Sequence, residues 1–236
     1  MTTPLADHFG DIDLSIDPDG APYWQAMWGP KLRGKSYFAR LYFASWPYDR
    51  VVIDPTRDFD PEGSMTRMWT GPYTSFPEPE DGETRVSLRL VPNRRHPDWR
   101  DELERALWCV LEAGKSPQNG GRGRRIFLHV DEIKVLFSVG HVGPAGETIL
   151  NEGRHYGLWL STCGPRTKTV DPLSIQQADS NYVFGPLHEL DVRRLAECCS
   201  LDWRQLAALV RSLEHFGFLR IWTHEQRIAL YPPVPA

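Results

Sequence analysis

Eight residues near the start of the chain have the types and spacing of a phosphate-binding loop. They read G-x-x-x-x-G-K-S and are, in order, Gly29, Pro30, Lys31, Leu32, Arg33, Gly34, Lys35 and Ser36. In such a loop, backbone N–H groups surround the phosphates, the lysine contacts the terminal phosphates and the serine hydroxyl binds Mg²⁺. The segment predicts a site for a nucleoside triphosphate such as ATP, with Mg²⁺ as its metal.

Two acidic residues could complete that chemistry. Asp131 and Glu132 follow the apolar run RIFLHV at residues 125–130. The first carboxylate can hold the metal, and the second can polarise an attacking water. An ordinary exit from a strand into a loop is the alternative, and the phosphate loop in the same chain disfavours it.

The segments around the phosphate loop are those that it needs. A strand must precede such a loop and a helix must follow it, because the helix N-terminus directs its N–H groups at the anion. Residues 23–28, YWQAMW, are apolar enough for a buried strand, and residues 35–46 place Phe38, Leu41 and Tyr42 at helical spacing. With both segments present, a surface loop rich in glycine and proline is the weaker interpretation.

Further segments predict an α/β sheet. Residues 50–55 and 85–91 read as strands, and residues 56–84 between them read as an irregular excursion rich in proline and glycine. A helix is expected over residues 101–114, where Asp101 and Glu104 can form a capping box.

The C-terminal residues 200–236 predict a helix followed by a β-hairpin, with Asp202 and Gln205 capping the helix. A winged-helix DNA reader shares that order of elements, but we favour an element that completes the nucleotide-binding domain. Residues 1–20 are expected to be an N-terminal extension. Together these assignments predict one domain over residues 1–236.

Composition bounds the class of protein. The 236 residues suit one α/β domain, with 41% hydrophobic residues, 25% charged residues and a net charge of −4. No apolar stretch approaches the roughly 20 residues that span a bilayer, and the N-terminus lacks the pattern of a secretion signal. These features favour a cytoplasmic protein without membrane insertion. The cysteines are expected to be buried, reduced thiols rather than a metal site or disulfides; they are Cys109, Cys163, Cys198 and Cys199.

Two blocks resemble a known family. Residues 148–165, TILNEGRHYGLWLSTCGP, and residues 177–197, QADSNYVFGPLHELDVRRLAE, are similar to the HerA/FtsK superfamily of ring-forming DNA translocases. The likeness extends over residues 23–231 and is greatest to the genome-packaging ATPases of membrane-containing icosahedral phages. It implies a three-layer RecA-like sandwich, with extra strands between the phosphate-loop strand and the acid-ending strand.

The resemblance also implies roles for residues. Nucleotide binding falls to residues 29–36, metal binding to Ser36 and Asp131, and the catalytic base to Glu132.

The family's next strand usually ends in Thr-Gln, where the glutamine senses the γ-phosphate. The matching residues here are Thr162 and Cys163, and a thiol is a poor donor compared with an amide. Thr162 could take the role, as could Gln176 or Gln177.

An arginine offered to the neighbouring subunit is implied as well. Arg154 matches its place, and Arg166 is the second choice; a solvated arginine at a helix end is the alternative for Arg154.

The implied function is an ATP-driven translocase of double-stranded DNA that packages a viral genome as a homo-oligomeric ring, pentamer or hexamer. The implied partners are double-stranded DNA and a capsid vertex protein, in the host cytoplasm or the virion. Alternatives are a plasmid or cellular translocase, and a switch that hydrolyses ATP weakly.

DNA contact could involve the basic run at residues 120–125 or the aromatic run at residues 66–76, although the latter is expected to fold onto its own domain.

Overall fold

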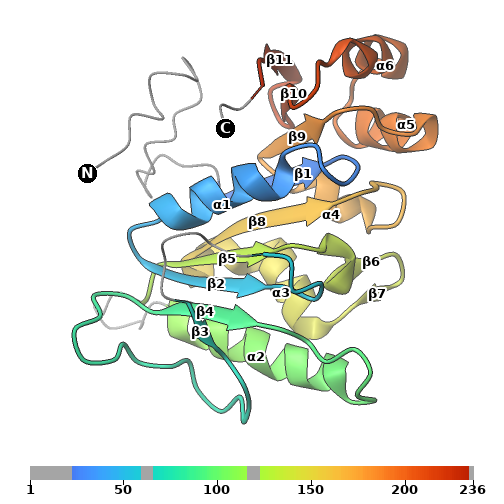
Figure 1. Cartoon of the computed structure of the whole chain (residues 1–236). Helices are drawn as coiled ribbons and strands as arrows, with labels where there is room; N and C mark the ends of the chain where they lie inside the picture. The colour runs from blue at the N-terminus through green and yellow to red at the C-terminus, as the bar shows by residue number, and fades with distance from the viewer. Residues whose placement is uncertain (1–22, 60–65, 116–122, 234–236) are drawn as a thin grey trace.

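The computed structural model describes residues 23–59, 66–115 and 123–233, and its centre is a nine-stranded sheet (Figure 1). Residues 1–20 therefore lie outside the described residues. The strand order is β11-β10-β9-β1-β8-β5-β2-β4-β3. The strands of this sheet are β1 (Trp24–Trp28), β2 (Asp49–Ile53), β3 (Arg67–Met68), β4 (Ser87–Leu90), β5 (Ile126–Val130), β8 (Leu158–Gly164), β9 (Ser180–Phe184), β10 (Phe218–Trp222) and β11 (Arg227–Tyr231).

The helices flank this sheet, and a small hairpin stands beside it. The α-helices are α1 (Lys35–Ser45), α2 (Trp99–Gly114), α3 (Pro144–Glu152), α4 (Pro172–Gln176), α5 (Glu189–Cys198) and α6 (Trp203–Ser212). The shorter elements are the 3₁₀ turns η2 (Ile133–Val135) and η3 (Gly153–Tyr156) and the hairpin strands β6 (Phe137–Ser138) and β7 (His141–Val142). Within the described ranges, no helix combines the length and apolarity needed to cross a membrane.

Strand direction places the candidate residues at one edge. Strands β9, β1, β8, β5, β2, β4 and β3 run parallel, so their carboxyl ends meet at the same edge of the sheet. Strand β8 lies between the phosphate-loop strand β1 and the acid-ending strand β5. This is the order expected for a RecA-like sandwich, and the predicted fold class is confirmed.

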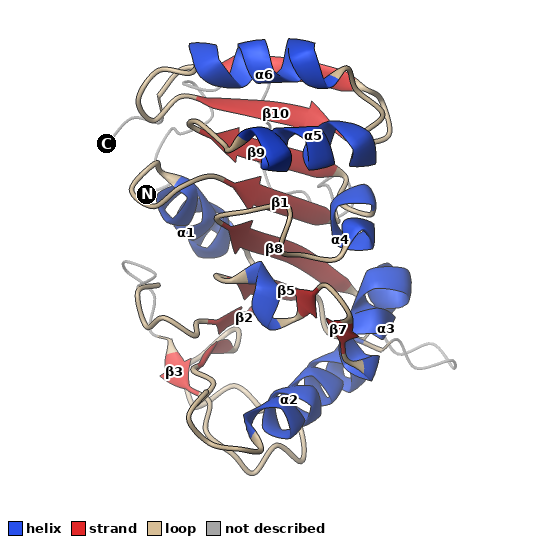
Figure 2. Cartoon of the chain, turned by 90° about the vertical axis from the view of Figure 1, so that its right-hand side faces the viewer, coloured by secondary structure: helices blue, strands red, loops and turns tan. Residues whose placement is uncertain are grey.

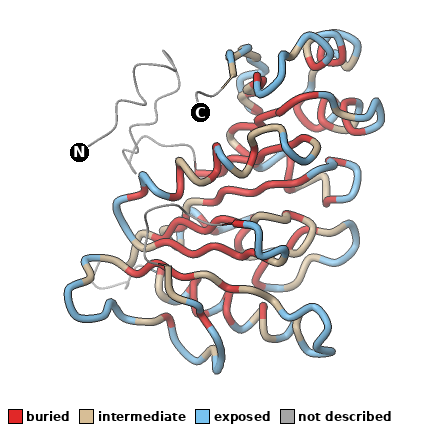
Figure 3. The backbone as a smooth tube through the Cα atoms, in the orientation of Figure 1, coloured by how far each residue is buried: buried red, intermediate tan, exposed pale blue. Residues whose placement is uncertain are grey.

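Helices cover both faces of the sheet, which gives three layers (Figure 2). Helix α1 packs on one face over an aromatic cluster that includes Phe38, Phe43, Phe184 and Phe218. Helices α2 to α6 contribute to a larger apolar cluster on the other face. The strands from β10 to β4 are largely buried, whereas the edge strands β11 and β3 are not (Figure 3). All four cysteines are buried and free, and their predicted burial is confirmed.

The C-terminal helix and hairpin belong to the same sheet. Strand β10 pairs antiparallel with β9, and β11 then pairs with β10 at the edge. The side chain of Asp202 accepts hydrogen bonds from the N–H groups of Arg204 and Gln205 at the start of α6, as predicted for the cap.

The predicted capping box of α2 is wrong. The helix begins at Trp99, so Asp101 lies inside its first turn. Glu104 instead accepts a hydrogen bond from the N–H of Ala145 at the start of α3, at 2.9 Å. The side chain that the local pattern assigned to a helix cap therefore makes a tertiary contact with another helix.

Candidate functional site: a nucleotide cleft at the carboxyl edge

The phosphate loop owes its shape to two glycines. Gly29 has φ +149°, and its N–H donates to the carbonyl of Gly164 at 3.2 Å. A Cβ at Gly29 would lie 2.1 Å from the carbonyl oxygen of Phe184, so only glycine fits there. Gly34 has φ +98° and precedes α1, a conformation that residues with a Cβ rarely adopt.

Lys35 lies under the loop with 9% of its surface exposed, and its Nζ donates to the carbonyl of Pro30 at 2.7 Å. Burial lowers its pKa, an effect that neighbouring groups including Asp131 and Glu132 oppose. The ammonium group thus lies inside the loop, where a phosphate oxygen can replace the carbonyl as its acceptor.

Ser36 and Asp131 meet at the start of α1. Ser36 Oγ donates to Asp131 Oδ1 at 3.4 Å, and Thr56 Oγ1 donates to Asp131 Oδ2 at 3.3 Å. Burial tends to raise the pKa of Asp131, but the neighbouring His129 and Lys35 are among the groups that outweigh it, and the pKa is lowered. A hydroxyl beside an ionised carboxylate is the kind of oxygen pair that Mg²⁺ prefers.

Glu132 lines the same cleft. Its Oε1 is buried and forms no hydrogen bond with any described residue, although Lys134 Nζ lies 3.7 Å away. A carboxylate oxygen in that position can accept a hydrogen bond from a water held in the cleft.

The cleft has a volume of about 480 Å³ and is lined by one more basic than acidic side chain. Its basic side chains are Lys31, Arg33, Lys35 and Arg40, and its acidic ones are Asp58, Asp131 and Glu132. The surplus of cations suits a triphosphate. Phe216, a residue that is 42% exposed, adds an aromatic surface at the same cleft.

Sequence reasoning missed several of these residues. Thr56 and Arg40 were not assigned to the site, nor was Phe216, which comes from the loop before β10. Thr56 carried a signal, because it follows β2 and the carboxyl ends of parallel strands share an edge. For Phe216 no local signal was present.

The structure does not bring the Thr162 side chain to the cleft. It is buried, and its Oγ1 accepts a hydrogen bond from Trp24 Nε1 at 3.2 Å on the other side of the sheet. Cys163, the next residue on β8, lines the cleft instead, because side chains alternate along a strand. Gln176 and Gln177 precede β9 and lie at the opposite, amino-terminal edge. The sensor role of Thr162 remains a prediction.

Arg154 also lies away from the cleft of its own chain. It belongs to η3, before β8, and its Nη2 contacts Asp179 Oδ1 at 3.2 Å. The Arg154 side chain is 67% exposed, so a neighbouring subunit could reach it. Arg166 follows β8 at the edge that carries the cleft and is also exposed. The role of either arginine toward a neighbour remains a prediction.

Comparisons with known proteins agree on the fold. The genome-packaging NTPase B204 of Sulfolobus turreted icosahedral virus 2, solved with AMPPCP, superposes with a TM-score of 0.67 at 21% identity, covering 90% of this chain and 98% of that one. The DNA-packaging ATPase B204 of Sulfolobus turreted icosahedral virus gives a TM-score of 0.64 at 19% identity, covering 89% and 97%. The chain has the fold of these packaging NTPases.

The same fold also extends to a conjugation coupling protein. The pCW3 conjugation coupling protein TcpA, solved with ATPγS, gives a TM-score of 0.58 at 12% identity, covering 92% of this chain and 61% of that one. No family model and no curated protein matches the sequence. The resemblance to HerA/FtsK-type packaging ATPases is thus confirmed at the level of the fold.

Proposed function

We propose that the protein is a Mg²⁺-dependent ATPase that moves double-stranded DNA. The favoured form of this activity is the packaging of a viral genome into a capsid. The observation that carries this proposal is the meeting of Lys35, Ser36 and Asp131 in one cleft at the carboxyl edge of the sheet. The names of the structural neighbours, which are packaging NTPases and a conjugation coupling protein, support DNA as the cargo.

In this proposal, residues of the cleft take the steps of ATP hydrolysis. Lys35 binds the terminal phosphates together with the N–H groups of residues 29–36. Ser36 and Asp131 would hold a bound Mg²⁺, which would supply positive charge to neutralise the phosphates. Glu132 accepts a hydrogen bond from the attacking water and orients it.

In this proposal, a ring of subunits completes the nucleotide site. Such a ring, with five or six subunits, brings an arginine of one subunit to the nucleotide of the next, where it stabilises charge on the transferred phosphoryl group. Arg154 is the first candidate because it is exposed at the edge opposite its own cleft, and Arg166 is the second. A capsid vertex protein is the proposed anchor of the ring.

DNA contact is better supported at residues 93–100 than at the basic run 120–125. Residues 120–122 of that run lie outside the described residues, and its Arg124 already pairs with Asp49 at 3.3 Å. In the loop after β4 and the first turn of α2, three arginines are exposed and pair with no acidic group of the described chain: Arg94, Arg95 and Arg100. Exposed arginines without an acidic partner suit phosphate oxygens, and Arg94 and Arg100 also lie over the ring of Trp99.

The aromatic run at residues 66–76 does not offer free rings. Trp69 and Phe76 are buried, and Trp69 packs edge-on against Tyr73 with ring centroids 5.3 Å apart. The run folds onto its own domain, as expected.

A second candidate is a nucleotide-dependent switch that hydrolyses ATP slowly. Cys163 favours it, because the thiol stands where an amide usually contacts the γ-phosphate. A plasmid or cellular translocase of the same fold is the other alternative.

The decisive assay measures phosphate release from ATP with and without double-stranded DNA, together with electron microscopy of the assembly. The translocase requires DNA-stimulated hydrolysis and closed rings. Nucleotide binding with negligible hydrolysis in the presence of DNA supports the switch.

A further inference from the structure

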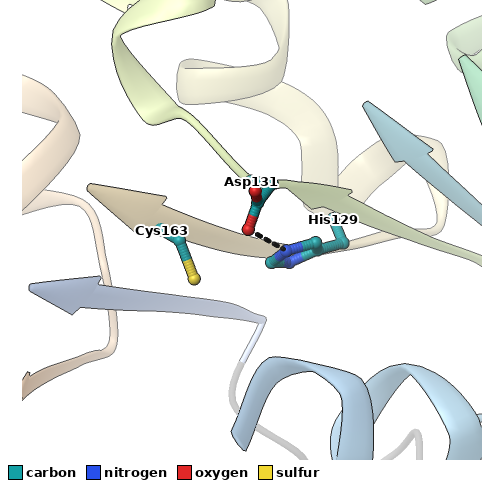
Figure 4. Close-up of side chains that lie close together, drawn as sticks. All are labelled: His129, Asp131 and Cys163. Atoms are coloured by element: carbon teal, nitrogen blue, oxygen red, sulfur yellow. Dashed lines mark ion pairs between the residues drawn. The ribbon is translucent and has the colours of Figure 1, made fainter. Parts of the chain in front are cut away.

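Three potential metal ligands meet beneath the nucleotide cleft. They are His129, Asp131 and Cys163, and their donor atoms all lie within 4.8 Å of one another (Figure 4). The pairing of β5 with β8 produces the cluster, because Val130 is opposite Thr162 and the side chains of the flanking residues project from the same face.

One ring nitrogen of His129 has no hydrogen-bond partner among the described residues. The residue is fully buried, and its Nδ1 is 3.1 Å from Ser161 Oγ. Its Nε2 forms no hydrogen bond with any described residue and faces Asp131 Oδ1 at 3.8 Å, too far for a hydrogen bond. A buried polar atom left without a partner is costly, and a bound cation would satisfy it.

The donor set selects a class of metal. The cluster offers an imidazole nitrogen, a carboxylate oxygen and a sulfur, and Cys163 Sγ lies 3.7 Å from Met27 Sδ on the next strand. Nitrogen and sulfur ligands suit Zn²⁺ and Cd²⁺, whereas Mg²⁺ prefers oxygen.

We propose that His129, Asp131 and Cys163 form a site for a thiophilic divalent cation, and that this cation inhibits the nucleotide site by occupying Asp131. The proposal that a cation binds depends only on the geometry of the three side chains. The proposal that the cation inhibits rests on the proposed function. On binding, the Cys163 thiol loses its proton to solvent and the thiolate sulfur bonds to the metal.

The cleft provides the entry path. Asp131 and Cys163 both line it, and His129 lies behind them. The nearby Lys35 ammonium donates to the Pro30 carbonyl in this conformation. A cation can therefore bind in the nucleotide-free protein, and Mg²⁺ with ATP should exclude it, because one carboxylate cannot serve both metals.

The test of binding is a Cd²⁺ titration followed by the ultraviolet sulfur-to-cadmium charge-transfer band. We expect a band in the wild type, its loss in Cys163→Ala, and affinity at least about tenfold weaker in His129→Gln. Cys109→Ala is the matched control, because it removes another buried thiol outside the cluster, and it should keep the band. Wild-type behaviour of Cys163→Ala, or no band in the wild type, overturns the proposal.

The test of inhibition adds Zn²⁺ to the ATPase assay. We expect inhibition that excess Mg²⁺ with ATP relieves, and an inhibition constant for Zn²⁺ at least about tenfold higher in Cys163→Ala than in Cys109→Ala. Equal inhibition of the two variants overturns the regulatory part. If the protein hydrolyses no ATP, the proposed function fails while the Cd²⁺ titration still decides the site.

Discussion

Ser36 Oγ lies 3.4 Å from Asp131 Oδ1, although 95 positions separate the two residues in the chain. The contact exists because β1 and β5 end at the same edge of the sheet and α1 starts directly above that edge. It places a hydroxyl from the phosphate loop beside the carboxylate that ends β5. The account of the protein as an ATPase depends on this pair.

Lys35→Ala should weaken ATP binding by roughly 10- to 100-fold. The substitution removes charge-assisted hydrogen bonds worth about 1.5–3 kcal/mol to the phosphates. Titration with a fluorescent ATP analogue measures the change. Lys31→Ala is the matched control, because Lys31 belongs to the same loop but is exposed. Equal losses in the two variants would show that the loop contributes only general positive charge.

Glu132→Gln should bind ATP normally and hydrolyse it at least about 100-fold more slowly, since the amide cannot take a proton from water. Single-turnover hydrolysis with a parallel binding measurement separates the two effects. Asp58→Asn removes another acid from the cleft and should retain most of the activity. Hydrolysis at the wild-type rate in Glu132→Gln is incompatible with a base at this position.

Gly29→Ala should destabilise the fold by about 3 kcal/mol or more. The new Cβ would lie 2.1 Å from the Phe184 carbonyl oxygen, and φ is +149°. Urea denaturation measures the loss. Gly82→Ala is the control: Gly82 also has positive φ but has open space around it, so only the backbone cost of about 1–2 kcal/mol applies. A smaller loss in Gly29→Ala than in Gly82→Ala would contradict the packing of the loop against β9.

Replacing Arg94 and Arg95 with alanine should weaken binding of double-stranded DNA. The slope of log affinity against log salt should fall by about 1 per arginine that contacts phosphate. The control replaces Arg193 and Arg194, which form ion pairs with Glu189 and Glu197 on α5. Equal losses of DNA affinity in the two double variants would contradict a DNA contact at residues 93–100.

The sequence predicted the parts of the site that depend on local pattern. The phosphate loop was recognisable because Gly29 and Gly34 occupy positions where backbone conformation or close packing demands glycine. The acids were recognisable because they end a short apolar run that becomes β5. Each of these two signals is contained within a few consecutive residues.

The remaining features depend on contacts that local pattern does not encode. Which of Thr162 and Cys163 faces the cleft depends on how β8 is placed in the sheet. His129 was read only as part of an apolar strand, and its approach to Cys163 follows from the register of β5 with β8. Glu104 was assigned to a helix cap and instead binds α3, a contact set by how the two helices pack.

A double-mutant cycle on Ser36 and Asp131 tests the central claim most directly. Affinity for ATP is measured with Mg²⁺ in the wild type, Ser36→Ala, Asp131→Asn and the double variant, and again with the metal chelated. If both residues hold one Mg²⁺ beside the triphosphate, their effects are coupled by about 1 kcal/mol or more with Mg²⁺ and the coupling disappears without it. Additive effects in both conditions would contradict a shared metal and, with it, the proposed ATPase site.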